Sequence, residues 1–93
     1  GDPGSVPLAS DDPAIRFVIP QRLTLSDRPG AMKHMQIRLN WPASGHMTAG
    51  SGGKTLWKGF IKSRPERRIL APLAPLLKVA PREAVQLRIG AGN

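Results

Sequence analysis

The clearest hydrophobic pattern in the chain is a strict alternation over residues 35–41. Apolar side chains occupy every second position and polar side chains the positions between, with Met35, Ile37, Leu39 and Trp41 set against Gln36, Arg38 and Asn40. A period of two over seven residues is typical of a strand with one buried face. Pro42 ends the pattern because proline has no N–H for a sheet ladder. We therefore expect a strand that buries Trp41 with the three aliphatic side chains.

Three other segments predict strands. Residues 15–19 are short, apolar and β-branched, and residues 22–25 continue them after a bend, because Pro20 cannot donate a ladder hydrogen bond. Residues 85–89 alternate apolar and polar side chains in the same way as residues 35–41. Residues 55–63 also favour a strand, but apolar groups fall on both of its faces, so its inward side stays open.

The remaining segments predict a helix, a turn and a loop. Apolar spacing over residues 69–79 favours one short helix near 72–79, with Pro72 at the first helical position and Pro75 limiting its length. Residues 26–30 contain Pro29-Gly30, a pair suited to a type II turn. Residues 43–54 carry four glycines, from which we expect a mobile loop.

Together these segments predict a mainly β fold, either a small barrel or a curled antiparallel sheet of four to six strands with one short helix near 72–79. The 93 residues suffice for one domain, which we expect over residues 14–90. Residues 1–13 are rich in Gly, Pro, Ser and Asp and predict a disordered tail, in which residues 1–5 look like a cloning remnant.

Residues 54–89 carry a family resemblance. Ile69 and Pro72 come near its start, Leu73, Leu76 and Leu77 form a helix face, and Pro81 and Val85-Gln86-Leu87 form a turn and a strand. This order resembles the closing unit of small β-barrels of the AbrB/MazE-like and DUF1905-like kind. The chain departs from it at Arg82-Glu83, where those families favour Gly-Asp, and at Lys78, where they favour glycine. Because AbrB-like members bind DNA and MazE-like members are antitoxins, the resemblance implies DNA binding.

Charge is the most informative property of the composition. The chain has 14 Lys and Arg against six Asp and Glu, a formal net charge of +8, and all but three of the acids lie in the first twelve residues. Such an excess favours an anionic partner, because the partner relieves the repulsion among the cations. DNA or RNA is the leading candidate, and an acidic protein surface is the alternative. A membrane is not expected, because no apolar run approaches the ~20 residues of a spanning helix.

Cations concentrate in a short stretch, within which six of them span fifteen residues: Lys54, Lys58, Lys62, Arg64, Arg67 and Arg68. These residues are the predicted phosphate contacts, and Arg38 and Arg88 are outlying members. Lysine supplies a point charge and arginine a fork that grips phosphate oxygens with two hydrogen bonds. Trp57 and Phe60 are interleaved with the lysines, so they are candidates for base stacking, although a chain with few aromatics needs such rings in its core.

Little in the chain favours catalysis, a metal or a cofactor. There is no cysteine, and the two histidines, His34 and His46, are twelve residues apart with few acids to join them. Gly53-Lys54-Thr55 lacks the upstream glycine and the following helix of a phosphate-binding loop. We therefore expect a binding module rather than an enzyme, with neither metal nor cofactor. The absence of a signal-peptide pattern favours the cytoplasm, and so small a core is compatible with a homodimer.

Overall fold

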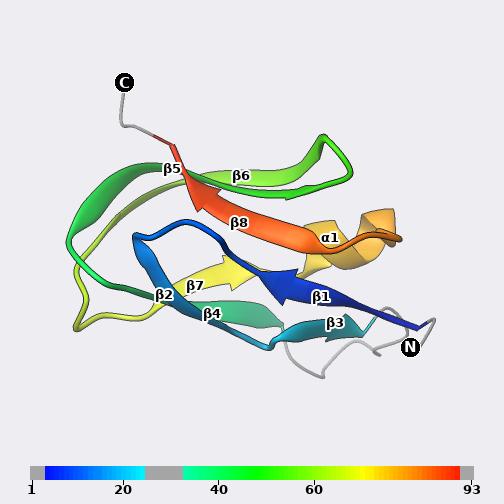
Figure 1. Cartoon of the computed structure of the whole chain (residues 1–93), viewed down its shortest axis with the longest axis horizontal. Coiled ribbons are helices and arrows are strands. Elements are labelled where there is room, and N and C mark those ends of the chain that lie inside the picture. Colours follow the sequence, from blue (N-terminus) through cyan, green and yellow to red (C-terminus); the bar gives the residue numbers. More distant parts are fainter. Residues whose placement is uncertain (1–3, 25–32, 91–93) are drawn as a thin grey trace.

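The computed structural model describes residues 4–24 and 33–90, and these residues form a mainly β fold (Figure 1). In chain order the elements are β1 (Ser5–Ala9), β2 (Ile15–Ile19), β3 (Arg22–Thr24), β4 (His34–Leu39), β5 (Ala43–Ser51), β6 (Lys54–Ser63), β7 (Ile69–Pro72), α1 (Ala74–Val79) and β8 (Val85–Ile89). The predicted fold class is confirmed, as are the strands at residues 15–19 and 85–89. The turn predicted at residues 26–30 lies outside the described residues.

The strands form two sheets. One has five strands in the order β3-β1-β8-β5-β6, and the other has three in the order β2-β4-β7. Neighbouring strands are antiparallel, except that β1 runs parallel to β8. The long β5–β6 hairpin curves at the end where it approaches the smaller sheet, so the structure is a curled sheet rather than a closed barrel (Figure 1).

The core lies between the two sheets and is aliphatic. Met35, Ile37 and Leu39 of β4 are fully buried, as the alternation predicts. They face side chains of the larger sheet that are equally buried: Leu8, Met47, Ala49, Val85 and Leu87. The prediction for Trp41 is wrong. Its strand ends at Leu39, and the indole is 48% exposed because the alternation of a strand no longer holds past the strand's end.

Residues 5–9 do not belong to a tail. They form β1, which lies between β3 and β8 and buries Val6 and Leu8. β1 pairs antiparallel with β3 and parallel with β8, so its hydrogen-bond partners lie both near to and far from it along the chain. The sequence did not predict this strand, because its two buried side chains are too few to give a clear period and its neighbours are glycines, prolines and acids.

The glycine-rich segment is likewise a strand rather than a mobile loop. β5 occupies the interior of the larger sheet, where β6 and β8 supply ladder partners on both sides. Gly45, Met47 and Ala49 point into the core. Glycine lowers the intrinsic preference for a strand, but pairing on both sides overrides that preference.

The helix is shorter than predicted, because Ile69–Pro72 is strand β7. α1 begins at Ala74, so Pro75 stands in the first turn, where its missing N–H costs little. Leu76 is the residue that α1 buries fully. The helix ends at Val79, and the capping residue Ala80 has a left-handed backbone with φ of 52° and donates its N–H to the carbonyls of Leu76 and Leu77.

Candidate functional site

The outer face of the five-stranded sheet collects polar and basic side chains. Strand pairing places the following residues on it, which together we call the basic sheet face: Ser44, His46, Thr48, Lys58, Phe60, Lys62 and Arg88. In this face Lys62 lies opposite Ser44, and Phe60 lies opposite His46. Lys58, Thr48 and Arg88 form a row across three strands. The face exists because β5 and β8 turn their apolar alternate positions inward, and β6 does so at Trp57 and Ile61.

Phe60 is the most exposed large hydrophobic side chain in the described structure, at 66%. The imidazole of His46 lies against it in an edge-to-face arrangement, with ring centroids 5.7 Å apart and an interplanar angle of 78°. Lys58 and Lys62 flank Phe60 on the same face of β6, two residues away on either side. An apolar ring held open to solvent between two cations is the most unusual feature of this surface, since rings of this size are normally buried.

Trp57 faces the other way. It lies on the inward side of β6, is half-buried and packs against the core. Its indole covers Gly59, where an added Cβ would stand 2.5 Å from the ring. Of the two stacking candidates, Phe60 therefore lies on the surface, whereas Trp57 packs against the core.

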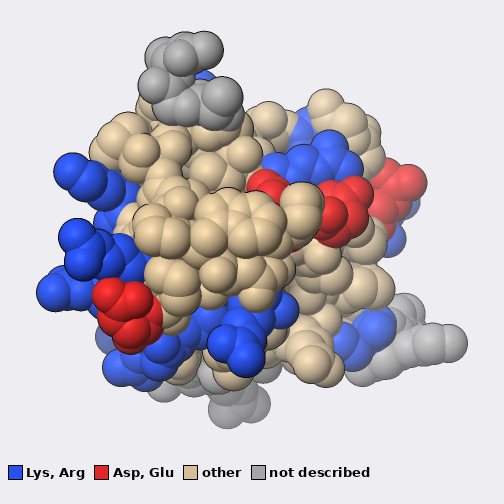
Figure 2. Space-filling model, turned by 60° about the vertical axis from the view of Figure 1, so that its left-hand side comes forward, with Lys and Arg blue, Asp and Glu red and all other residues tan. Residues whose placement is uncertain are grey.

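The basic sheet face continues past Lys62 into the turn that follows β6. Arg64 and Arg67 line an open hollow of about 630 Å³ together with Ser44, Lys62 and Glu66. Figure 2 brings this end of the molecule forward and shows Lys and Arg side chains gathered along the left and lower part of the surface. In the described part of the chain, the one ion pair joins Arg88 to Asp11. Among the described residues, no carboxylate forms an ion pair with Lys58, Lys62, Arg64 or Arg67, and Glu66 is the one acid that lines this hollow.

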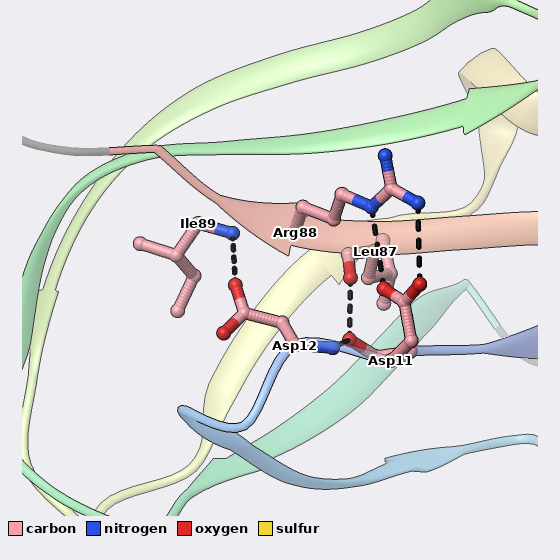
Figure 3. A network of polar contacts seen from close by, with 6 residues as sticks. Asp11, Asp12, Leu87, Arg88 and Ile89 are labelled. Carbon is pink, nitrogen blue, oxygen red and sulfur yellow. Dashed lines mark hydrogen bonds and ion pairs between the residues drawn. The ribbon is translucent and has the colours of Figure 1, made fainter.

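Arg88 belongs to the same face, but its charge is compensated. Its guanidinium donates to both carboxylate oxygens of Asp11 at 3.3 Å (Figure 3). This hydrogen bond, together with the positive charge of Arg88, lowers the pKa of the Asp11 carboxyl below its ordinary value. The pair therefore persists as pH falls, until the pH drops through that lowered pKa. Asp11 and Asp12 also border the face on its β8 side, where they line a hollow with Lys58.

The other predicted contacts lie elsewhere. Arg38 lies on β4 of the three-stranded sheet and donates to the carbonyl of Pro65 at 3.3 Å. Arg68 directly precedes β7 and donates to Oε1 of Gln36 on β4 at 3.2 Å. Lys54 is the first residue of β6, next to the hairpin turn, and lines a separate hollow with Arg88. The eight predicted cations therefore do not form one continuous patch. Lys58, Lys62 and Arg88 lie on the outer face of the larger sheet, and Arg64 and Arg67 follow Lys62 in the turn after β6.

The outer face of the three-stranded sheet carries an apolar group of its own. Ile19 and Leu70 flank Gln36 in one row, and Phe17 stands opposite Arg38 in the next. Phe17 and Ile19 are each 42% exposed, and Leu70 is 57% exposed. This surface combines exposed apolar side chains with two arginines that have no carboxylate partner among the described residues.

Sequence reasoning missed His46 and Ser44 as members of the site, because it placed both in a loop. A signal was present: polar side chains alternate with small or apolar ones from Ser44 to Ala49. The glycines in that segment concealed the period. Asp11 was missed as the partner of Arg88 because the two residues are 77 positions apart.

No protein-family model, curated protein or solved structure matches the chain. The resemblance of residues 54–89 to AbrB/MazE-like and DUF1905-like domains thus stays a prediction. Residues 4–24 and 33–90 contain no helix long and apolar enough to cross a membrane. In the same residues, no three His, Asp or Glu side chains lie together as metal ligands would.

Proposed function

We propose that the protein is a nucleic-acid-binding module whose basic sheet face contacts the phosphate backbone. One observation carries the proposal: Lys58, Lys62, Arg64 and Arg67 follow one another along an open face and into a hollow, and none of them forms an ion pair with a carboxylate of residues 4–24 or 33–90. Cations in such an array attract a chain of regularly spaced anions, and each phosphate they neutralise releases condensed counterions.

The spacing of the cations suits a backbone. Lys58 and Lys62 are four residues apart on one strand face, or ~13 Å at ~3.3 Å per residue. A polynucleotide strand that runs along β6 would place phosphates near both ammonium groups. Its next phosphates would then reach Arg64 and Arg67. Two acids, Asp11 and Asp12, lie at the β8 side, and one, Glu66, lies in the hollow with Arg64 and Arg67. The more favourable path for phosphate therefore follows β6 toward the arginines.

Binding should depend steeply on salt and on the two lysines. We expect labelled oligonucleotides, single- and double-stranded DNA and RNA, to bind at about 50 mM salt and to lose affinity sharply at about 200 mM. In the variant Lys58→Gln/Lys62→Gln, affinity should fall roughly tenfold or more for each lysine that contacts a phosphate, because charge-assisted hydrogen bonds contribute about 1.5–3 kcal/mol each. The salt slope, meaning the steepness with which the logarithm of affinity falls against the logarithm of salt concentration, should also decrease. We expect a decrease of about 0.7–0.9 for each phosphate that the variant no longer neutralises. Fluorescence anisotropy measures both quantities.

Lys78→Gln provides the matched control, because Lys78 is an exposed lysine on α1, outside the basic sheet face. It removes a lysine charge of the same kind and should leave affinity within about twofold. The double variant removes two charges and the control one. A logarithmic loss of affinity in the control about half that of the double variant would therefore mean that net charge alone, rather than this face, attracts the nucleic acid. If no oligonucleotide binds at low salt, the proposal fails, and an acidic protein surface becomes the partner of the same cations.

A protein partner is the second candidate function, and the three-stranded sheet favours it. Phe17, Ile19 and Leu70 are exposed beside Arg38 and Arg68, a combination that suits an extended segment with alternating apolar and acidic side chains. A second copy of the chain fits less well, because a symmetric contact would bring these arginines toward each other.

Leu70→Ser tests this second function. A labelled synthetic peptide of alternating valine and glutamate should bind the unmodified protein, and binding should weaken at least fivefold in the variant. Nucleic-acid affinity should not change, because Leu70 lies outside the basic sheet face. The control Val79→Ser removes a similarly exposed apolar side chain from α1. If the peptide does not bind, or if both variants weaken it alike, this function is excluded. A dimer that dissociates in Leu70→Ser would assign the face to a second copy.

A further inference from the structure

The geometry of the basic sheet face points to single-stranded nucleic acid as its ligand, with one base stacked on Phe60. This inference rests on the proposed function and adds the class of nucleic acid and the residue that selects it. Backbone contacts through lysine and arginine serve duplexes and single strands alike. An exposed aromatic ring serves only bases that are free to leave a stack.

Phe60 is available for stacking in the way the inference requires. It is 66% exposed, although the described core contains no phenylalanine. Its place on the outward side of β6 follows from the register, which turns Trp57 and Ile61 inward. The edge-to-face contact with His46 engages Phe60 with one neighbour and leaves most of the ring in solvent. That contact also restricts the ring before a ligand arrives, which reduces the entropy lost on binding.

The surrounding cations fit a stacked nucleotide. Lys58 and Lys62 lie two residues before and two residues after Phe60, so each is ~7 Å away along the strand. A base on the ring therefore has an ammonium group on either side to meet the phosphates of its own and the adjacent nucleotide. Ser44 and His46 offer hydrogen-bonding groups on the neighbouring strand, within the same face.

A duplex cannot use this arrangement. Its bases are paired and stacked inside the helix, so they would have to be extruded to reach a ring that lies on an open sheet. A duplex resting on the face would contact Lys58 and Lys62 while leaving Phe60 against its sugar and phosphate groups. We therefore expect a preference for single strands that depends on Phe60 and not on the lysines.

Phe60→Leu tests the inference, since it keeps an apolar side chain but removes the aromatic face. With labelled oligothymidylate of about 12 nucleotides, affinity should fall about fivefold to 100-fold. The salt slope should not change, because no cation is removed. Affinity for a duplex of the same length should change less than twofold. Phe60→Trp should keep or exceed the original affinity, because it retains an aromatic face for stacking.

Phe17→Leu is the matched control. It makes the same substitution at an exposed phenylalanine on the other sheet and should leave oligothymidylate affinity unchanged. The inference is overturned if Phe60→Leu binds oligothymidylate as tightly as the original protein, if the control loses as much, or if the duplex binds equally well. Should Lys58→Gln/Lys62→Gln still weaken binding in those cases, the phosphate-binding function stands without the stacked base. Should no oligonucleotide bind at all, both fail together.

Discussion

At the scale of single residues, backbone conformation and side-chain direction decide most of what is unusual in this protein. Phe60 is exposed because alternate residues of β6 point to opposite faces. Trp57, Gly59 and Ile61 point inward, so Phe60 points outward. Ala80 adopts a left-handed conformation because the chain must reverse after α1, and its N–H satisfies two helix carbonyls in doing so. A residue with a Cβ reaches that conformation at a cost of roughly 1–2 kcal/mol.

Ala80→Gly should therefore stabilise the protein. Glycine removes the steric cost at φ of 52° but adds freedom to the unfolded chain, so we expect a net gain of about 0.5–1 kcal/mol. Urea unfolding followed by circular dichroism measures the change, and the transition midpoint should rise without a change in its slope. Ala74→Gly makes the same replacement inside α1 and should not stabilise. A lower midpoint for Ala80→Gly would show that the alanine's own packing outweighs its backbone strain.

At the scale of elements, side chains between β1 and β2 form hydrogen bonds that hold β8 beside β1. Asp12 accepts a hydrogen bond from the backbone N–H of Ile89 at 2.8 Å (Figure 3) and another from the backbone N–H of Ala14 at 2.9 Å. Ser10 donates its hydroxyl to the carbonyl of Leu87 and accepts from the N–H of Asp12. These contacts join the segment that follows β1 to β8, the strand beside β1 in the larger sheet. They also set the acidic border of the basic sheet face.

Asp12→Ala should be clearly destabilising. It leaves two backbone donors without their acceptor, one of them at the end of β8, and we expect a loss of about 1–3 kcal/mol. Thermal and urea unfolding provide the measurement. Asp11→Ala is the comparison, because Asp11 makes only an exposed ion pair with Arg88, and such pairs contribute little. The assignment of Asp12 as a structural acid would be wrong if the two variants lost stability equally.

At the scale of the whole molecule, two sheets share one aliphatic core and present different outer faces. The larger sheet offers uncompensated cations around an exposed ring, and the smaller sheet offers apolar side chains beside two arginines. The predicted cations thus divide between surfaces with different chemistry. The proposed nucleic-acid contact and the second candidate, a protein contact, are for this reason separable by single substitutions.

Periodicity and charge are local properties, so the amino-acid sequence alone predicts the mainly β class, the strands at residues 15–19 and 85–89, and the basic character of β6. It also predicts a strand over residues 35–41, of which the part up to Leu39 is confirmed. The other features depend on tertiary contacts. Residues 43–51, predicted as a loop, form a strand because β6 and β8 pair with them on both sides, and residues 5–9 join the sheet because they pair with β3 and β8. The fold also places Asp11 beside Arg88, 77 positions away, and leaves Phe60 rather than Trp57 exposed on the surface. Each of these outcomes depends on which distant strand lies alongside, and no local pattern carries that information.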